Sequence, residues 1–307
     1  MFFYAPSIKH YKTSVYQNTS RPFFIPVSVT GSSCQLGCEH CRGRILKSMH
    51  AAAAPAELLE IGERLARRGA GGVLVSGGSR ADGTVPLTEY LGAIRGLKEM
   101  GLKVAVHTGL VDERLADGLA EAGVDSAMID IIGANETIKR VYHLDASTAD
   151  FERSLALLCR SGVKTSPHIV LGLDFGNISG EMQAMEMISN YEIWSLVLVV
   201  ITPQPDTPMA AVLPPRPAEL GNLFVKARRM FPRTPVLLGC ARPAGSHKTE
   251  TDALALKAGI NGIAYPAEGI VELAGALGLK PGFSEHCCSL IFQEGIDDSQ
   301  GEQLASC

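Results

Sequence analysis

The stretch Cys34-Gln35-Leu36-Gly37-Cys38-Glu39-His40-Cys41 carries three thiols at C-x3-C-x2-C spacing, directly after a short β-type run at 25–30. One tight loop of this kind can aim three thiolates at a single point and leave a fourth coordination position open. Thiolates select zinc or iron–sulfur clusters, and structural zinc requires four ligands, but no further Cys or His pair follows at zinc-finger spacing. The spacing therefore favours a [4Fe–4S] cluster with one free iron over a zinc knuckle or three unrelated thiols.

Composition limits the function classes. The 307-residue chain is long enough for one large α/β barrel or two domains, and its net charge of −4 indicates neither a nucleic-acid-binding face nor a membrane-surface patch. The longest apolar run, 194–201, is too short to cross a bilayer, and the N-terminus lacks the basic and apolar regions of a signal peptide. We therefore expect a soluble, cytoplasmic protein whose eight cysteines are metal ligands or reduced thiols.

Hydrophobic periodicity predicts alternating strands and helices along most of the chain. The strands are expected at 25–30, 72–76, 103–107, 126–131, 165–171, 194–201, 235–238 and 261–264. Helices are expected near 55–68, 87–100, 112–122, 148–161, 180–190, 217–230, 248–258 and 268–278. Eight such units predict a closed (β/α)8 TIM-type barrel at 25–280, preceded by an irregular arm at 1–24 and followed by a tail at 281–307.

Active sites of such barrels lie at the carboxyl ends of the strands, so polar residues there are candidate ligands. Ser76-Gly77-Gly78-Ser79 follows the second predicted strand, and His107, Asp130 and His168 end or lie within the next three. Taken alone, the Gly-Gly segment is typical of a turn, and a single His or Asp at a strand end is typical of a hydrogen-bonded core group. Their convergence on one barrel mouth favours contacts to a cofactor or substrate.

A second set of thiols lies late in the sequence. Cys159 falls among apolar residues of a predicted helix and Cys307 is the last residue, which leaves Cys240 after the seventh strand and the adjacent pair Cys287 and Cys288 in the tail. If the tail folds back over the barrel mouth, these three can bind an auxiliary [4Fe–4S] cluster. The alternative is a redox-labile adjacent pair with Cys240 in the core.

The chain resembles the radical S-adenosylmethionine (SAM) superfamily, whose signature is the thiol triplet at this spacing. Within it, the segments 130–133, 141–145, 167–173, 239–243 and 285–290 resemble the biotin-synthase-like branch and, in particular, the two-component lipoyl synthases. The one-component lipoyl synthases carry auxiliary cysteines before the radical SAM loop, and residues 1–33 contain none. His40 and Ser79 depart from the family pattern, in which an aromatic residue and a Glu are usual.

The resemblance implies that SAM chelates the free iron of the cluster on Cys34, Cys38 and Cys41 and is reductively cleaved to a 5′-deoxyadenosyl radical. The implied SAM contacts are His40, Ser76, Gly77, Gly78, Ser79, His107, Asp130, His168, Gly172 and Pro203. The implied reaction is sulfur insertion at C6 or C8 of a protein-bound octanoyl chain, with the auxiliary cluster as sulfur donor.

The implied partners are an octanoylated lipoyl domain or glycine-cleavage H protein, a paired lipoyl synthase component, and a ferredoxin- or flavodoxin-type reductant. Two other readings stay open. One is another biotin-synthase-like reaction, either desthiobiotin sulfuration or a carbon-skeleton rearrangement. The other is a non-enzymatic iron–sulfur module that does not cleave SAM.

Overall fold

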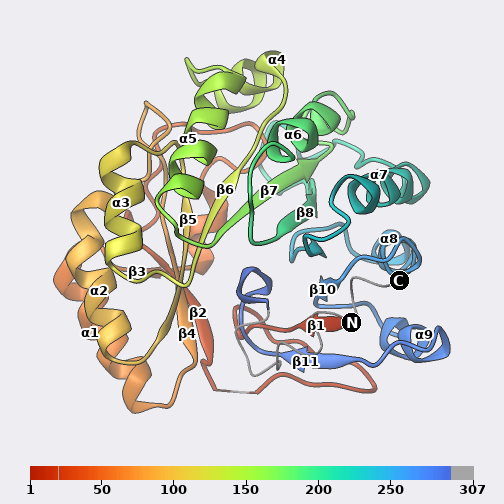
Figure 1. Ribbon diagram of the computed structural model, residues 1–307, viewed down its shortest axis with the longest axis horizontal. Coiled ribbons are helices and arrows are strands. Elements are labelled where there is room, and N and C mark those ends of the chain that lie inside the picture. Colours follow the sequence, from red (N-terminus) through yellow and green to blue (C-terminus); the bar gives the residue numbers. More distant parts are fainter. Residues whose placement is uncertain (20, 292–307) are drawn as a thin grey trace.

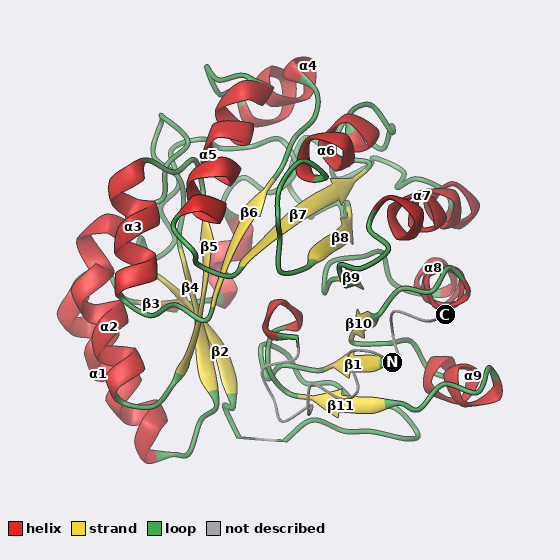
Figure 2. Cartoon of the chain, in the orientation of Figure 1, coloured by secondary structure: helices red, strands yellow, loops and turns green. Residues whose placement is uncertain are grey.

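The computed structural model describes residues 1–19 and 21–291, which form one curled parallel sheet with helices on its outer face (Figures 1 and 2). The strands, all parallel, are β1 (Phe2–Tyr4), β2 (Phe24–Ser28), β3 (His50–Ala51), β4 (Gly72–Ser76), β5 (Lys103–Thr108), β6 (Ser126–Asp130), β7 (Thr165–Leu171), β8 (Leu196–Val200), β9 (Val236–Leu238), β10 (Gly262–Ala264) and β11 (Gly282–Ser284). Every strand predicted from the sequence is present. Two of them, β4 and β7, match residue for residue.

The helices that cover the sheet are α1 (Pro55–Arg67), α2 (Leu91–Glu99), α3 (Glu113–Glu121), α5 (Thr148–Arg160), α6 (Glu181–Ile188), α7 (Pro217–Met230), α8 (Ser246–Lys257) and α9 (Ile270–Ala276). These are the eight predicted helices. The helix predicted at 87–100 begins as the 3-10 turn η2 (Leu87–Tyr90) and continues as α2. The sequence did not predict the short α4 (Asn135–Thr137), the π-helix η3 (Ile138–Tyr142) that continues it, or the 3-10 turns η1 (Arg44–Ser48) and η4 (Cys288–Leu290).

Alternation along the strands divides the apolar residues between two packing regions. On β5, Val104 and Val106 face the helices and belong to the large core between sheet and helices. Ala105, between them, faces the lumen together with Phe24 and Met128. The sheet therefore has a helix-covered outer face and an inner face that surrounds a lumen.

The predicted α/β barrel class is confirmed in an open form, and the expectation of a closed ring is wrong. Among the described residues the sheet order is β11-β1-β10-β9-β8-β7-β6-β5-β4-β2-β3, with β11 and β3 at its two edges. The arm expected to be irregular supplies β1, which pairs with both β10 and β11.

Side chains of the arm bridge the arm and the tail beside β11. The Tyr16 ring stacks on the Phe283 ring with centroids 4.0 Å apart and an interplanar angle of 8°. The Glu285 carboxylate accepts hydrogen bonds from the Thr19 backbone N–H at 2.9 Å and its hydroxyl at 2.7 Å. Contacts of this kind hold the tail in place although its own strand is only three residues long.

The tail segment 287–291 occupies the lumen. Leu290 packs against Phe24, Ala105 and Met128 on one side of the lumen. Ile291 belongs to a cluster with Tyr4 and Val197 on the other side. The described part of the tail, up to residue 291, does not lie over the barrel mouth as expected, because its contacts lie where strands begin.

Two contacts fix this placement. The His286 ring meets the Phe23 ring, just before β2, edge-on at 4.8 Å. The Trp194 indole N–H, just before β8, donates to the Ile291 carbonyl at 3.1 Å. The tail thus lies in the lumen near the amino ends of the strands, opposite the end where the thiol loop lies.

Small residues on the inner face leave space for this segment. Ser126, Ser166 and Ser195, all fully buried, form a row of hydroxyls across β6, β7 and the residue before β8. The Ser195 hydroxyl donates to the Ser166 oxygen at 2.9 Å, and the Ser126 and Ser166 oxygens are 3.4 Å apart. These bonds satisfy polar atoms that burial would otherwise leave unpaired.

Candidate functional site: a thiol-lined cavity at the barrel mouth

The three thiols of the signature loop line one cavity of about 140 Å³ at the carboxyl ends of the first strands. Cys38 and Cys41 are buried and Cys34 is partly buried. The cavity is also lined by the other predicted residues His40, Ser76, Gly77, Gly78, Ser79, His107 and Asp130. The structure therefore brings together ten of the residues that the sequence marked.

Backbone contacts fix the thiol loop against the Gly-Gly segment after β4. The Gln35 N–H donates to the Ser79 carbonyl at 2.8 Å, and the Gly78 N–H donates to the Thr30 hydroxyl at 2.7 Å. A Cβ on Gly78 would lie 2.0 Å from the Ser33 carbonyl oxygen and 2.7 Å from the Cys34 Cα. Glycine is needed at this position because two stretches of backbone meet there.

The thiols interact closely enough to change one another's ionisation. A hydrogen bond from Cys38, helped by the His40 imidazole, lowers the pKa of Cys41 to about 4. The same bond and burial raise the pKa of Cys38. One thiolate is therefore favoured at neutral pH, as a metal-binding loop requires.

The donor set of this loop fits a cluster better than a single metal ion. Within residues 1–19 and 21–291, no three His, Cys, Asp or Glu side chains are arranged to hold one metal ion. In a [4Fe–4S] cluster each thiolate binds a different iron, so three cluster ligands need not converge on a single ion. Three thiols from one loop around a cavity meet that requirement and leave one iron without a protein ligand.

Three polar side chains of the lumen, His107, Asp130 and His168, lie close to one another at the cavity. His107 Nε2 lies 3.4 Å from Asp130 Oδ1, and the His107 and His168 rings are 5.1 Å apart. Burial alone would lower the pKa of His107 and raise that of Asp130, but their mutual attraction outweighs it and shifts both the other way. Burial and His107 lower the pKa of His168 to about 4, so this imidazole is neutral.

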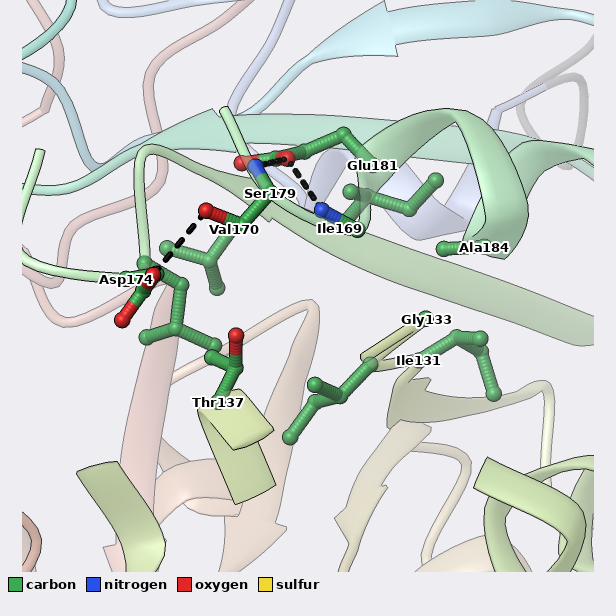
Figure 3. Close-up of a pocket in the computed structure, with 12 residues that line it drawn as sticks. Ile131, Gly133, Thr137, Ile169, Val170, Asp174, Ser179, Glu181 and Ala184 are labelled. Carbon is green, nitrogen blue, oxygen red and sulfur yellow. Dashed lines mark hydrogen bonds between the residues drawn. The ribbon is translucent and has the colours of Figure 1, made fainter. Parts of the chain in front are cut away.

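Three predicted SAM contacts, His168, Gly172 and Pro203, are not among the residues lining the thiol cavity. The Gly172 N–H donates to Glu181 at 2.8 Å, and that carboxylate also accepts from the Ser179 and Gly180 N–H groups. Figure 3 shows Glu181 beside a separate cavity of about 20 Å³, room for about one water molecule. Contacts from His168, Gly172 and Pro203 to SAM stay predictions.

The cavity also has members that the sequence did not reveal. Tyr142 lines it from η3, and its ring lies 5.6 Å from the His40 ring.

An ion pair beside the thiol loop was also not predicted. The Arg44 guanidinium, at the start of η1, pairs with Asp206 in the loop after β8 at 3.2 Å. This ion pair joins loops that follow two widely separated strands, and no periodic pattern marks either residue.

The second set of thiols gathers in the lumen. The pKa of Tyr265 is raised mainly by burial and, to a smaller extent, by the charges of Cys240, Cys287 and Cys288. These three cysteines therefore lie near the Tyr265 ring. A hydrogen bond from Cys288 lowers the pKa of Cys287 to about 6, and the Ser289 hydroxyl donates to Cys287 Sγ at 3.2 Å. Cys159 lies apart, half-buried on α5 against the outer core, and Cys307 lies outside the described residues.

Comparisons with known proteins agree with this geometry. The radical SAM superfamily model matches residues 28–180, about half of the chain and all three signature cysteines. A biotin synthase from Sorangium cellulosum (strain So ce56) is 26% identical over 180 residues, covering 57% of this chain and 50% of the relative. One from Brucella ovis is 29% identical over 175 residues, covering 55% and 51%. The chain thus aligns with about half the length of these curated relatives.

Solved structures share the fold at low identity. Methylornithine synthase superposes with a TM-score of 0.58 at 16% identity, covering 85% of this chain and 83% of that one. HydG, a maturase of the [FeFe]-hydrogenase, superposes with a TM-score of 0.65 at 13% identity, covering 100% and 69%. None of the helices in the described part of the chain combines the length and apolarity of a membrane span. From its cysteine loop, its curled parallel sheet and these matches, the chain belongs to the radical SAM superfamily.

Proposed function

We propose that this chain is a radical SAM sulfurtransferase of the lipoyl synthase type, which inserts sulfur at an unactivated C–H of a protein-bound octanoyl chain. One observation carries the proposal: the tail brings Cys287 and Cys288 into the lumen, near Cys240. A barrel that only generates a radical does not need a second group of thiols beside its site.

The two thiol sets are close enough to serve one substrate. Cys287 packs against the cluster of lumen residues that contains Met128, and Met128 is paired directly with His107 across β5 and β6. His107 also lines the cavity of the first thiol loop. An acyl carbon near His107 would lie between the two sets, and such positioning accounts for a large part of many enzymes' rate enhancement.

The chemistry supplied by the bound cofactors is hydrogen-atom abstraction, from SAM on the cluster held by Cys34, Cys38 and Cys41, and sulfur donation, from an auxiliary cluster held by Cys240, Cys287 and Cys288. The chain's own residues hold and enclose the substrate. Leu290, together with Phe24, fills one end of the lumen and excludes water from the space where a carbon radical must survive. The neutral His168 imidazole and the Asp130 carboxylate offer polar contacts to a substrate in the lumen.

The partners follow from this reaction and are part of the proposal. The substrate would be an octanoylated lipoyl domain or glycine-cleavage H protein, and a paired lipoyl synthase component would insert the other sulfur. A ferredoxin- or flavodoxin-type protein would supply the electrons, in the reducing cytoplasm that exposed clusters require.

The biotin synthase relatives favour a second candidate, sulfur insertion into desthiobiotin. Both reactions need a sulfur source beside the SAM site, so the two candidates share the second set of thiols. They differ in the substrate that enters the lumen, a long acyl chain on a protein lysine or a small free acid.

The test uses the full chain, reconstituted anaerobically. Iron and sulfide analysis with Mössbauer spectroscopy would compare wild type with a Cys34/Cys38/Cys41→Ala variant, and Cys159→Ala is the control for loss of a thiol outside both sets. We expect the triple variant to keep a [4Fe–4S] cluster that disappears when Cys240, Cys287 and Cys288 are also replaced. A triple variant without any cluster would refute the sulfur-insertion proposal.

Product analysis then separates the candidates. Wild type, SAM and dithionite would be incubated with an octanoyl-lysine peptide or with desthiobiotin, and products would be identified by mass spectrometry. We expect a thiolated octanoyl peptide and 5′-deoxyadenosine. Sulfur in desthiobiotin alone would favour the second candidate, and a product without new sulfur would indicate a rearrangement.

A further inference from the structure

The π-helix η3 is clamped onto the signature loop. The Glu39 N–H donates to the Val141 carbonyl at 2.9 Å, and the His143 imidazole contacts the Glu39 carboxylate at 2.6 Å. His143 follows η3 in a left-handed conformation, with φ of 54°. A π-turn costs hydrogen-bond geometry and is retained mainly where it positions a side chain for function. The side chain at the end of this π-turn is Tyr142.

Tyr142 shares the cavity of the three cluster thiols. Its ring lies 5.6 Å from the ring of His40, the residue before Cys41. Burial, with the charges of Asp130, Cys38 and Cys41, raises the pKa of Tyr142 well above its usual value. The phenol is therefore protonated at neutral pH and can donate a hydrogen bond.

Tyr142 is half-buried, and its hydroxyl differs from those of two fully buried tyrosines. Tyr90 donates to the carbonyls of Val29 and Ala52 at 3.0 and 3.1 Å, and Tyr265 donates to the Pro6 carbonyl at 2.6 Å. No side-chain hydrogen bond of Tyr142 is found within residues 1–19 and 21–291. A half-buried phenol on the wall of the thiol cavity, with no partner in this part of the chain, is a hydrogen-bond donor available to an acceptor that arrives with the cluster.

We propose that Tyr142 tunes the SAM-binding cluster by donating an O–H···S hydrogen bond to its sulfur, on the side held by Cys38 and Cys41. Hydrogen bonds to sulfur are among the factors that set cluster reduction potentials. A donor stabilises the additional negative charge of the reduced state, so this bond makes the cluster easier to reduce. The inference rests on the superfamily's cluster at this loop and is independent of the sulfur-insertion proposal.

The test measures the midpoint potential of the cluster, not turnover. Tyr142→Phe removes only the hydroxyl. A redox titration followed by electron paramagnetic resonance gives the potential, and the signal of the SAM-binding cluster is identified as the one that changes when SAM is added. We expect a more negative potential, with threefold to tenfold less reduced cluster at a fixed solution potential. A tenfold change corresponds to about 59 mV for one electron.

Two further variants separate tuning from a change in structure. Tyr191→Phe, which loses a hydrogen bond to Glu152, is the control and should leave the potential unchanged. Replacement of Tyr142 by 3-fluorotyrosine strengthens the donor, and it should move the potential in the positive direction. Opposite shifts from the two substitutions cannot arise from disturbed packing.

Two results would overturn the inference. One is an unchanged potential in Tyr142→Phe at wild-type iron content. The other is weaker SAM binding at an unchanged potential, because the hydroxyl would then contact SAM and not sulfur. If Tyr142→Phe fails to retain the cluster, the fluorotyrosine protein alone decides: a potential that does not rise refutes the proposed bond.

Discussion

The loop that carries Cys240 depends on a buried ion pair. Arg242 Nε and Nη2 donate to the two oxygens of Asp252 at 2.5 and 3.1 Å, and both side chains are fully buried. Arg242 also donates to the carbonyls of Gly239 and Ala264, each at 2.6 Å. We predict that Asp252→Asn, which removes the charge at nearly constant volume, destabilises the protein by about 3–5 kcal/mol, because a buried guanidinium is left uncompensated.

Urea unfolding followed by circular dichroism measures this change as a shift in midpoint at constant slope. The control is Glu63→Gln, which breaks an exposed pair with Arg67 at 3.5 Å and should change stability by less than about 0.5 kcal/mol. A loss below about 1 kcal/mol in Asp252→Asn would show that the carbonyls of Gly239, Ala264 and Tyr265, which also accept from Arg242, are enough to hold its charge, and the reasoning would fail.

Three further predictions concern the tail, the loop and the lumen. Leu290→Ala should lower the unfolding free energy by about 2–5 kcal/mol, since it empties a buried site in the lumen; urea unfolding checks this. Gly78→Ala should lose bound iron after reconstitution, because its Cβ would lie 2.0 Å from the Ser33 carbonyl oxygen, whereas Gly92→Ala, with nothing within 4 Å, should bind iron like wild type. Burial and the neighbouring histidine lower the pKa of His168 to about 4, so its stabilising contribution is complete above pH 6.5 and falls between about pH 6.5 and 4, by up to about 1.4 kcal/mol per pH unit. His168→Phe should flatten the dependence of the urea midpoint on pH in that window, and an unchanged slope would contradict the assignment.

Long elements were predictable because their burial leaves a local signal. A strand covered on both faces appears as an apolar run, as in β8, and glycines such as Gly162 and Gly259 mark helix ends. The strands β1 and β11 have three residues each and lie in the arm and the tail, outside the alternation of strands and helices that revealed the equally short β9 and β10. The open edge of the sheet was unpredictable for the same reason.

The site was predictable where chemistry follows from spacing and from strand ends. The thiol triplet and the residues after β4, β5 and β6 meet in one cavity because parallel strands end at the same edge of the sheet. Tyr142 was missed, since a π-turn shifts a side chain by one position without a signature in the sequence. The direction from which the tail enters was wrongly predicted, because only tertiary contacts such as that of His286 with Phe23 determine it.

The tail in the lumen has a consequence for the order of events during synthesis. About 245 residues separate Cys41 from Cys287, and chains grow at about 5–20 residues per second. The signature loop therefore leaves the ribosome roughly 10–50 s before the segment that fills the lumen. Until then the inner-face side chains of Phe24, Ala105 and Met128 lack Leu290, which packs against them, so the growing chain exposes apolar surface in the lumen for this time.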